Sequence, residues 1–174
     1  NYLNNSLSSS ISYSKTFSGE PQVNMSLSAT HSQNTNTQVI NMTLPTFQGS
    51  VSRVFPFAPK SGTKKGFFEN INLQYSVRGE NRIQTTDSLF FKKEMFESAK
   101  SGFQHNIPIS TNFKLFKYLS FSTSANYNAT MVFNTIERSF DSENQEVITI
   151  DNKGYDAFST YNFSASLGTT VYGM

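Results

Sequence analysis

The clearest hydrophobic pattern in the chain runs over residues 119–136, LSFSTSANYNATMVFNTI. Seven of its nine odd positions are apolar, whereas the even positions are mostly Ser, Asn and Thr. A period of two over that length predicts a β-strand with one apolar face and one polar face. The polar face carries neither Lys nor Glu, which is unusual for a surface strand and typical of a strand between lipid and a water-filled lumen.

The same alternation recurs along the chain and predicts about seven strands, with no convincing helix. The expected strands are 7–17, 22–31, 38–57, 67–78, 102–110, 119–136 and 157–173. The expected connections are 18–21, 33–37, 58–66, 79–101, 112–118 and 137–155, of which 79–101 and 137–155 are predicted charged loops. Strands of soluble sheets are usually about 5–6 residues long, so the length of 119–136 also favours membrane strands.

The predicted strand 38–57 contains an irregularity. Its apolar residues occupy even positions as far as Leu44 and odd positions from Val51 onward, and the change falls between Pro45 and Gly49. One extra residue in a β-bulge would restore the facing, and Pro is tolerated in strands mainly at bulges and edges. The alternative is two strands separated by a tight turn.

Composition separates this chain from an ordinary soluble enzyme. Charged residues make up 15% of the 174 residues, against about 25% in typical globular proteins. The mean hydropathy of −0.42 and the absence of any apolar run near 18 residues exclude a membrane helix. The chain has no Cys, and its net charge of +2 gives no case for nucleic acid binding. It begins without Met and ends within a strand-like pattern, so we expect a fragment of a longer protein.

Charged and aromatic residues are distributed as a transmembrane barrel requires. Most charges lie in 58–66, 79–101 and 137–156, away from the positions that would face lipid. The first, third and fifth connections are predicted to be tighter or flanked by aromatic residues, and the second, fourth and sixth include both long loops. Outer-membrane barrels alternate in this way between short periplasmic turns and longer outer loops. One aromatic girdle is expected at the end with the short turns, formed by Phe17, Phe55, Phe57, Phe67, Phe68, Phe113, Phe116 and Tyr118. Residues 1–174 are therefore predicted to be a single region, an incomplete all-β, antiparallel transmembrane β-barrel of up-and-down strands.

One segment resembles a known family. Within 37–78, Leu44-Pro45 leads a strand, Arg53-Val54-Phe55-Pro56-Phe57 ends it, and Phe67-Phe68-Glu69-Asn70-Ile71 opens the next after a basic turn. Together with the GTTVYGM ending, this segment resembles the barrel of the lipopolysaccharide-assembly protein family LptD, in its Bacteroidetes-type form. The resemblance covers the whole chain, and only 44–71 is distinctive.

The resemblance implies a large barrel in the cell outer membrane that inserts lipopolysaccharide into the outer leaflet. It implies membrane lipids and lipopolysaccharide as ligands, an LptE-like lipoprotein plug, and a periplasmic Lpt bridge reached through an N-terminal domain that this chain lacks. We expect neither enzymatic activity nor a cofactor. The alternatives are another outer-membrane barrel, such as a TonB-dependent receptor or a secretion translocon, and a soluble β-sandwich adhesin or glycan-binding module.

No catalytic or metal-binding pattern stands out in the sequence. His31 and His105 are isolated, so a solvated or packed role is favoured over metal ligation. Four cations are expected to contact lipid phosphates at the outer rim by charge-assisted hydrogen bonds, namely Arg82, Lys92, Lys93 and Lys100. Pro45 and Gly49 are the predicted strand break. Pro45 also removes a ladder hydrogen bond and could therefore weaken a pair of strands that separates to let lipid leave. A plain bulge is the simpler interpretation.

Overall fold

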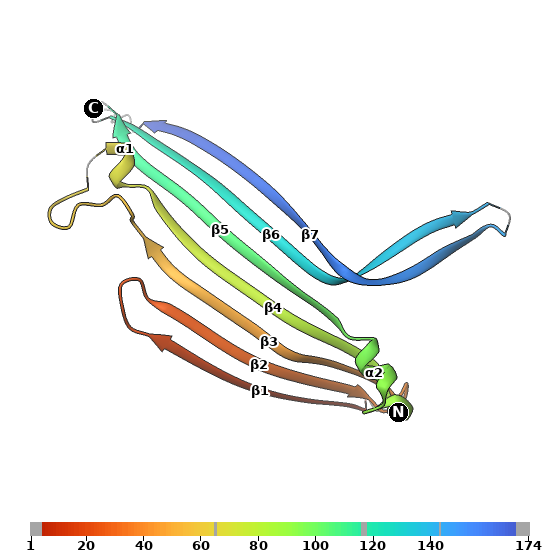
Figure 1. Ribbon diagram of the computed structural model, residues 1–174. Coiled ribbons are helices and arrows are strands. Elements are labelled where there is room, and N and C mark those ends of the chain that lie inside the picture. Colours follow the sequence, from red (N-terminus) through yellow and green to blue (C-terminus); the bar gives the residue numbers. More distant parts are fainter. Residues whose placement is uncertain (1–4, 65, 116–117, 143, 170–174) are drawn as a thin grey trace, which may run out of the picture.

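The computed structural model describes residues 5–64, 66–115, 118–142 and 144–169, and its seven strands form one antiparallel sheet. The strand order follows the sequence order, so each strand pairs with its neighbours in the chain (Figure 1). The strands are β1 (Ser6–Phe17), β2 (Val23–Asn34), β3 (Val39–Val54), β4 (Asn72–Thr86), β5 (Lys100–Leu115), β6 (Leu119–Asp141) and β7 (Glu146–Thr169). Short helical segments are α1 (Gly66–Glu69), η1 (Asp87–Leu89) and α2 (Lys93–Glu97).

The all-β, up-and-down arrangement of seven antiparallel strands confirms the fold class, as one open sheet. Both outermost strands, β1 and β7, have a single partner strand among the described residues. Their side chains are exposed along their whole described length. All seven strands lie in the same sheet, so this part of the chain is not a β-sandwich. No helix among the described residues is long and apolar enough to cross a membrane.

The predicted charged loops are wrong in extent. The connection between the two strands is only 87–99, because β4 continues to Thr86 and β5 begins at Lys100. Most of segment 137–155 is not a loop at all, since β6 and β7 remain paired out to Asp141 and Glu146. Charge is excluded from a lipid-facing surface, but it is compatible with a strand that faces water, so charge density alone does not mark the end of a strand.

Several smaller boundaries also differ from prediction. β3 ends at Val54 rather than at 57, β4 begins at Asn72 after α1 rather than at 67, and β5 extends to Leu115 into the predicted turn 112–118. The alternation of connection lengths is wrong, because 55–71 is the longest connection and lies at the end predicted to have short turns. Phe116 of the predicted girdle and residues 170–174 of the family-like ending lie outside the described residues.

The predicted bulge in β3 is confirmed, and the alternative of two strands is wrong. Leu44 and Pro45 together lie opposite one residue of β2 and one residue of β4, since Thr43 and Thr46 pair with Arg82 and Glu80. The Asn81 amide donates a hydrogen bond of 2.9 Å to the Leu44 carbonyl across the bulge. This contact satisfies a carbonyl that the ladder leaves free.

Gly49, by contrast, lies in regular register between Met25 and Val77 and is not part of the break. A Cβ at position 49 would lie 3.1 Å from Val77 Cγ1, so glycine permits close packing at this point.

The ladder register places most of the apolar residues of the strands on one face. Directly paired residues of antiparallel strands share a face, and one such row runs Tyr13, Leu27, Phe47, Gly79, Phe103, Met131 and Ala157. The large apolar side chains of this face stay exposed, with Leu27 at 48% and Phe163 at 77%. Contiguous apolar patches of this extent are rare on soluble monomers and mark a surface that contacts lipid or a partner.

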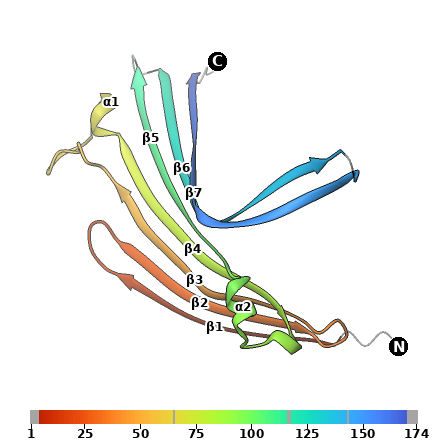
Figure 2. The ribbon, with the colours of Figure 1, turned by 45° about the vertical axis from the view of Figure 1, so that its right-hand side comes forward.

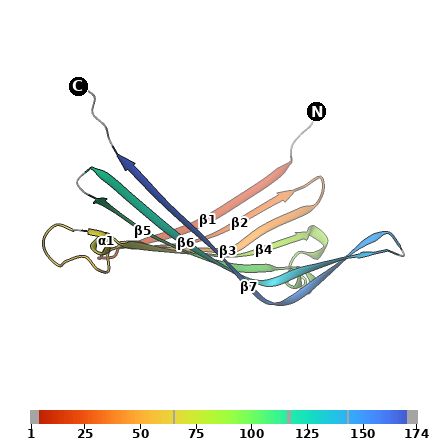
Figure 3. The same cartoon turned by 90° about the horizontal axis from the view of Figure 1, so that it is seen from above.

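The sheet is twisted and curved, and the β6–β7 hairpin projects away from it (Figures 2 and 3). The projection begins where the β6–β7 register shifts, between Val132 and Asn134. It lies beyond Gly102, the last residue of β5 that pairs with β6 at this end. The residues of the predicted charged loop therefore form a two-stranded extension of the sheet at the end where α2 also lies.

Candidate functional site

The polar face of the sheet is concave and hydrophilic. One hollow on it has a volume of about 550 Å³ and is lined by residues from six adjacent strands, β1 to β6. Most of the residues that line the hollow come from even positions, and their side chains are mostly small or uncharged, including Ser14, Ser26, Gln48, Asn106 and Asn128. A surface of hydroxyl and amide groups binds water well and gives polar sugars many hydrogen-bond partners.

Two further hollows lie on the same face. One is lined largely by serine, threonine and asparagine from β4, β5, β6 and β7, together with Arg53 of β3. The other lies toward the α2 end of the sheet and holds Arg78, Glu80, Arg82 and Lys100. Lys15 and Arg53 line the other two hollows, so four of the six charged side chains in these three hollows gather in one place.

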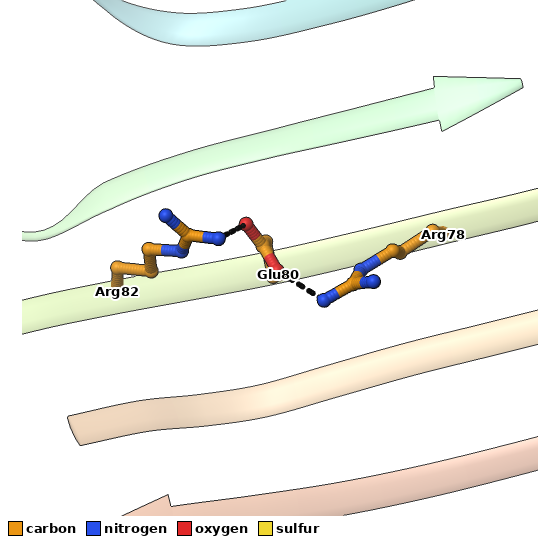
Figure 4. Close-up of polar contacts among 3 residues, drawn as sticks. All are labelled: Arg78, Glu80 and Arg82. Carbon is orange, nitrogen blue, oxygen red and sulfur yellow. Dashed lines mark hydrogen bonds and ion pairs between the residues drawn. The ribbon is translucent and has the colours of Figure 1, made fainter.

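Three of these charged groups alternate along β4 and form a linked cluster (Figure 4). The Glu80 carboxylate accepts from both neighbours: Oε1 lies 2.6 Å from Arg82 Nη2, and Oε2 lies 3.1 Å from Arg78 Nη2. The carboxylate is 24% exposed, whereas the arginine side chains are 55% and 67% exposed. Positions that differ by two share a face of a strand, which is why the sequence RGENR brings these three side chains together.

Lys100 of β5 completes the cluster, because it is the direct ladder partner of Arg82. The hollow thus contains three cations and one carboxylate, together with Gln104 and Asn134. Exposed guanidinium groups next to a lysine are well suited to bind a phosphate, since arginine donates two parallel hydrogen bonds to such an anion. Each single ion pair at this exposure stabilises the fold by no more than about 1 kcal/mol.

The structure brings together only two of the four predicted cations. Arg82 and Lys100 share the hollow, but Lys92 and Lys93 lie in the connection between β4 and β5, outside this cluster. Lys93 pairs with Glu97 one helical turn away, at 3.2 Å. The role of all four in binding phosphate stays a prediction.

Sequence reasoning missed Arg78 and Glu80 as members of the cluster. The signal was present, because Arg78, Glu80 and Arg82 continue the period of two of the predicted strand 67–78.

The two histidines are not grouped with other metal-ligating side chains. Among the described residues no three or more His, Cys, Asp or Glu side chains are arranged to hold a metal ion. His105 lies on the apolar face, where its Nδ1 is 2.7 Å from the Tyr75 hydroxyl and its ring stacks on the tyrosine ring. That contact fits a packed histidine, as expected from the sequence.

Long antiparallel strands in chain order, with an exposed apolar face and a concave face of uncharged polar residues, define the sheet type of outer-membrane β-barrels. The sequence model of the LptD protein family matches residues 1–174, and the chain belongs to this family. LptD proteins are outer-membrane proteins of lipopolysaccharide transport and assembly and are not a family of enzymes. The family resemblance predicted from 44–71 is confirmed. No curated protein and no solved structure matches the chain.

Proposed function

We propose that this chain is part of the β-barrel of an outer-membrane translocon that inserts lipopolysaccharide into the outer leaflet. The observation that carries the proposal is one continuous sheet with two opposite faces, in a chain of the LptD family. The apolar face contacts the acyl chains of the membrane, and the concave polar face lines the lumen. Further strands pair with the free edges of β1 and β7 to close the barrel, because an open sheet edge is not tolerated in lipid.

The polar face has a second role in this proposal. Its serine, asparagine and threonine side chains accommodate the sugars of lipopolysaccharide and the surface of an LptE-like lipoprotein plug. The periplasmic Lpt bridge delivers the lipid to the barrel through a domain outside this chain. The hollow around Arg78, Arg82 and Lys100 binds a phosphate group of the glycolipid as it passes.

Neutralising the cluster is expected to slow lipopolysaccharide delivery. The variant combines Arg78→Gln, Arg82→Gln and Lys100→Gln in the full-length protein, as the only copy in the cell. Loss of three phosphate ligands should lower the rate at which labelled glycolipid reaches the cell surface and raise permeability to large antibiotics. A matched variant removes the same number of exposed cations outside the hollows, by Lys60→Gln, Arg138→Gln and Lys153→Gln, and should behave as the parent.

A second control separates phosphate binding from a purely structural role. Glu80→Gln breaks both ion pairs but leaves all three cations in place. If the cluster binds phosphate, Glu80→Gln retains delivery. If its ion pairs only stabilise β4, Glu80→Gln shows the same defect as the triple variant. Unchanged delivery and permeability in the triple variant would contradict the phosphate role.

A further inference from the structure

The connection between β4 and β5 folds back over the apolar face of the sheet instead of projecting into solvent. Met95 of α2 is 3% exposed and packs on Ile40, Met42 and Ile83. Met42 and Ile83 are direct ladder partners, and Ile83 shares the face of Val77 and Gly79 on β4. This is the hydrophobic cluster of buried residues in the described structure, and it lies on the side of the sheet proposed to face lipid.

Hydrogen bonds join this connection to β2, to the turn before β3 and to β4. The Gln33 amide donates to Asp87 Oδ1 at 2.7 Å, which joins η1 to β2. The Asp87 backbone N–H donates to the carbonyl of Gln38, the residue before β3, and the Ser98 hydroxyl donates to the Gln84 carbonyl of β4. The segment is therefore held against the sheet, with Met95 turned inward.

That outward side is apolar and aromatic, with lysines beside it. Phe91 is 73% exposed and Phe96 is 56% exposed, and the Phe90 ring contacts the Phe91 ring with centroids 4.4 Å apart. Lys92 lies between Phe91 and α2, and the Lys93 side chain is 85% exposed while it pairs with Glu97. Aromatic side chains next to lysines, on a short helix lying along a surface, are typical of segments that rest at a membrane interface.

The position of the segment along the sheet fits the same interface. From Phe103 to Leu115, β5 carries the exposed apolar face over about 40 Å of strand, which spans about 28 Å of bilayer at a 45° tilt. That height matches the apolar band of about 25 Å on outer-membrane barrels. Ile83, under α2, lies about 13 Å further along the sheet than the Phe103 row, so α2 sits just beyond the band, at the level of the lipid headgroups.

We propose that segment 87–99 is a membrane-interface anchor that inserts Phe91 and Phe96 among the lipids of one leaflet and places Lys92 and Lys93 at their phosphates. The occupant of this surface is the lipid leaflet, because the aromatic side chains continue the exposed apolar face of the sheet. The inference rests on the proposed function, which makes that face lipid-facing. The anchor fixes the depth of the sheet in the bilayer next to the hollow that holds Arg82 and Lys100.

Nitroxide labels on single cysteines test this placement in the full-length protein, reconstituted in bilayers of phosphatidylcholine and phosphatidylglycerol. The test sites are Phe91→Cys and Phe96→Cys. Phe163→Cys on β7 is the reference for the lipid interior, and Phe140→Cys near the tip of the β6–β7 hairpin is the reference for water. The rates at which each label collides with oxygen and with a water-soluble nickel chelate report the depth of the label in the bilayer. The parent protein without an introduced cysteine, treated with the same label, is the blank.

The labels at 91 and 96 should show oxygen-to-nickel collision ratios well above the ratio at 140 and below that at 163. Ratios equal to that at 140 overturn the anchor while leaving the proposed function intact. Labels at 91 and 96 that neither reagent reaches also overturn it, because they would lie under a protein partner. A water-like ratio at 163 itself would instead refute the lipid-facing sheet, and with it both proposals.

Discussion

Replacing Phe163 by arginine is expected to lower the free energy of unfolding in a phospholipid bilayer by about 2–4 kcal/mol, the usual cost of a cation on the lipid face at mid-membrane. Phe163 is 77% exposed and lies in the row of Ala125, Ile109 and Leu73, near the middle of the exposed apolar face. The measurement is a denaturant titration of the full-length protein folded into vesicles.

The matched control for this substitution is Asn162→Arg, one residue away on the other face of β7. Asn162 pairs with Asn126 and points to the concave polar side, where an arginine remains hydrated. We expect a change in unfolding free energy within about 0.5 kcal/mol, as for surface substitutions in general. Equal costs for the two arginines would show that the two faces do not differ in their surroundings.

A side chain at position 79 is expected to be costly for a different reason. A Cβ on Gly79 would lie 2.6 Å from Phe103 Cδ1, because the phenylalanine ring covers the glycine from the adjacent strand. Gly79→Val should lower the unfolding free energy by about 1–3 kcal/mol, the usual cost of overpacking. Without that contact, the higher strand propensity of valine would favour the substitution.

Two variants identify the Phe103 ring as the cause of this cost. Gly168→Val on β7 introduces the same side chain where nothing lies within 4 Å and should not be destabilising. Combining Gly79→Val with Phe103→Ala should restore part of the loss, since the clash disappears. Additive effects in the double variant would contradict the close approach, because contacting residues are expected to couple.

The faces of the strands were predictable because they depend on local sequence. The alternation in 119–136 gave the two faces of β6 correctly, and the change of phase near Pro45 predicted the bulge at Leu44–Pro45. Both signals follow from the period of two, which needs no knowledge of distant residues. The sequence predicts too short a β4 because charges such as Glu80 and Arg82 are typical of loops, whereas in the structure they alternate on a face that is polar throughout.

The position of α2 was not predictable in the same way. A helix of five residues is too short for a helical period to be visible, and its amphipathic character depends on a single buried side chain, Met95. That side chain is buried because Met42 and Ile83 meet across the ladder, and the register that brings them together is a long-range property of the sheet. The ion pairs of Glu80 depend only on local alternation, so they can be predicted from the sequence.

The central claim, that the apolar face of the sheet meets lipid and the polar face meets water, is tested most directly along β6, where these faces carry the odd and the even positions. Nitroxide labels placed one at a time at positions 120 to 131 of the full-length protein in a bilayer should alternate in their surroundings. Odd positions should collide mainly with oxygen and even positions mainly with the water-soluble nickel chelate, with a period of two throughout. A uniform profile, or lipid contact at the even positions, would contradict the account.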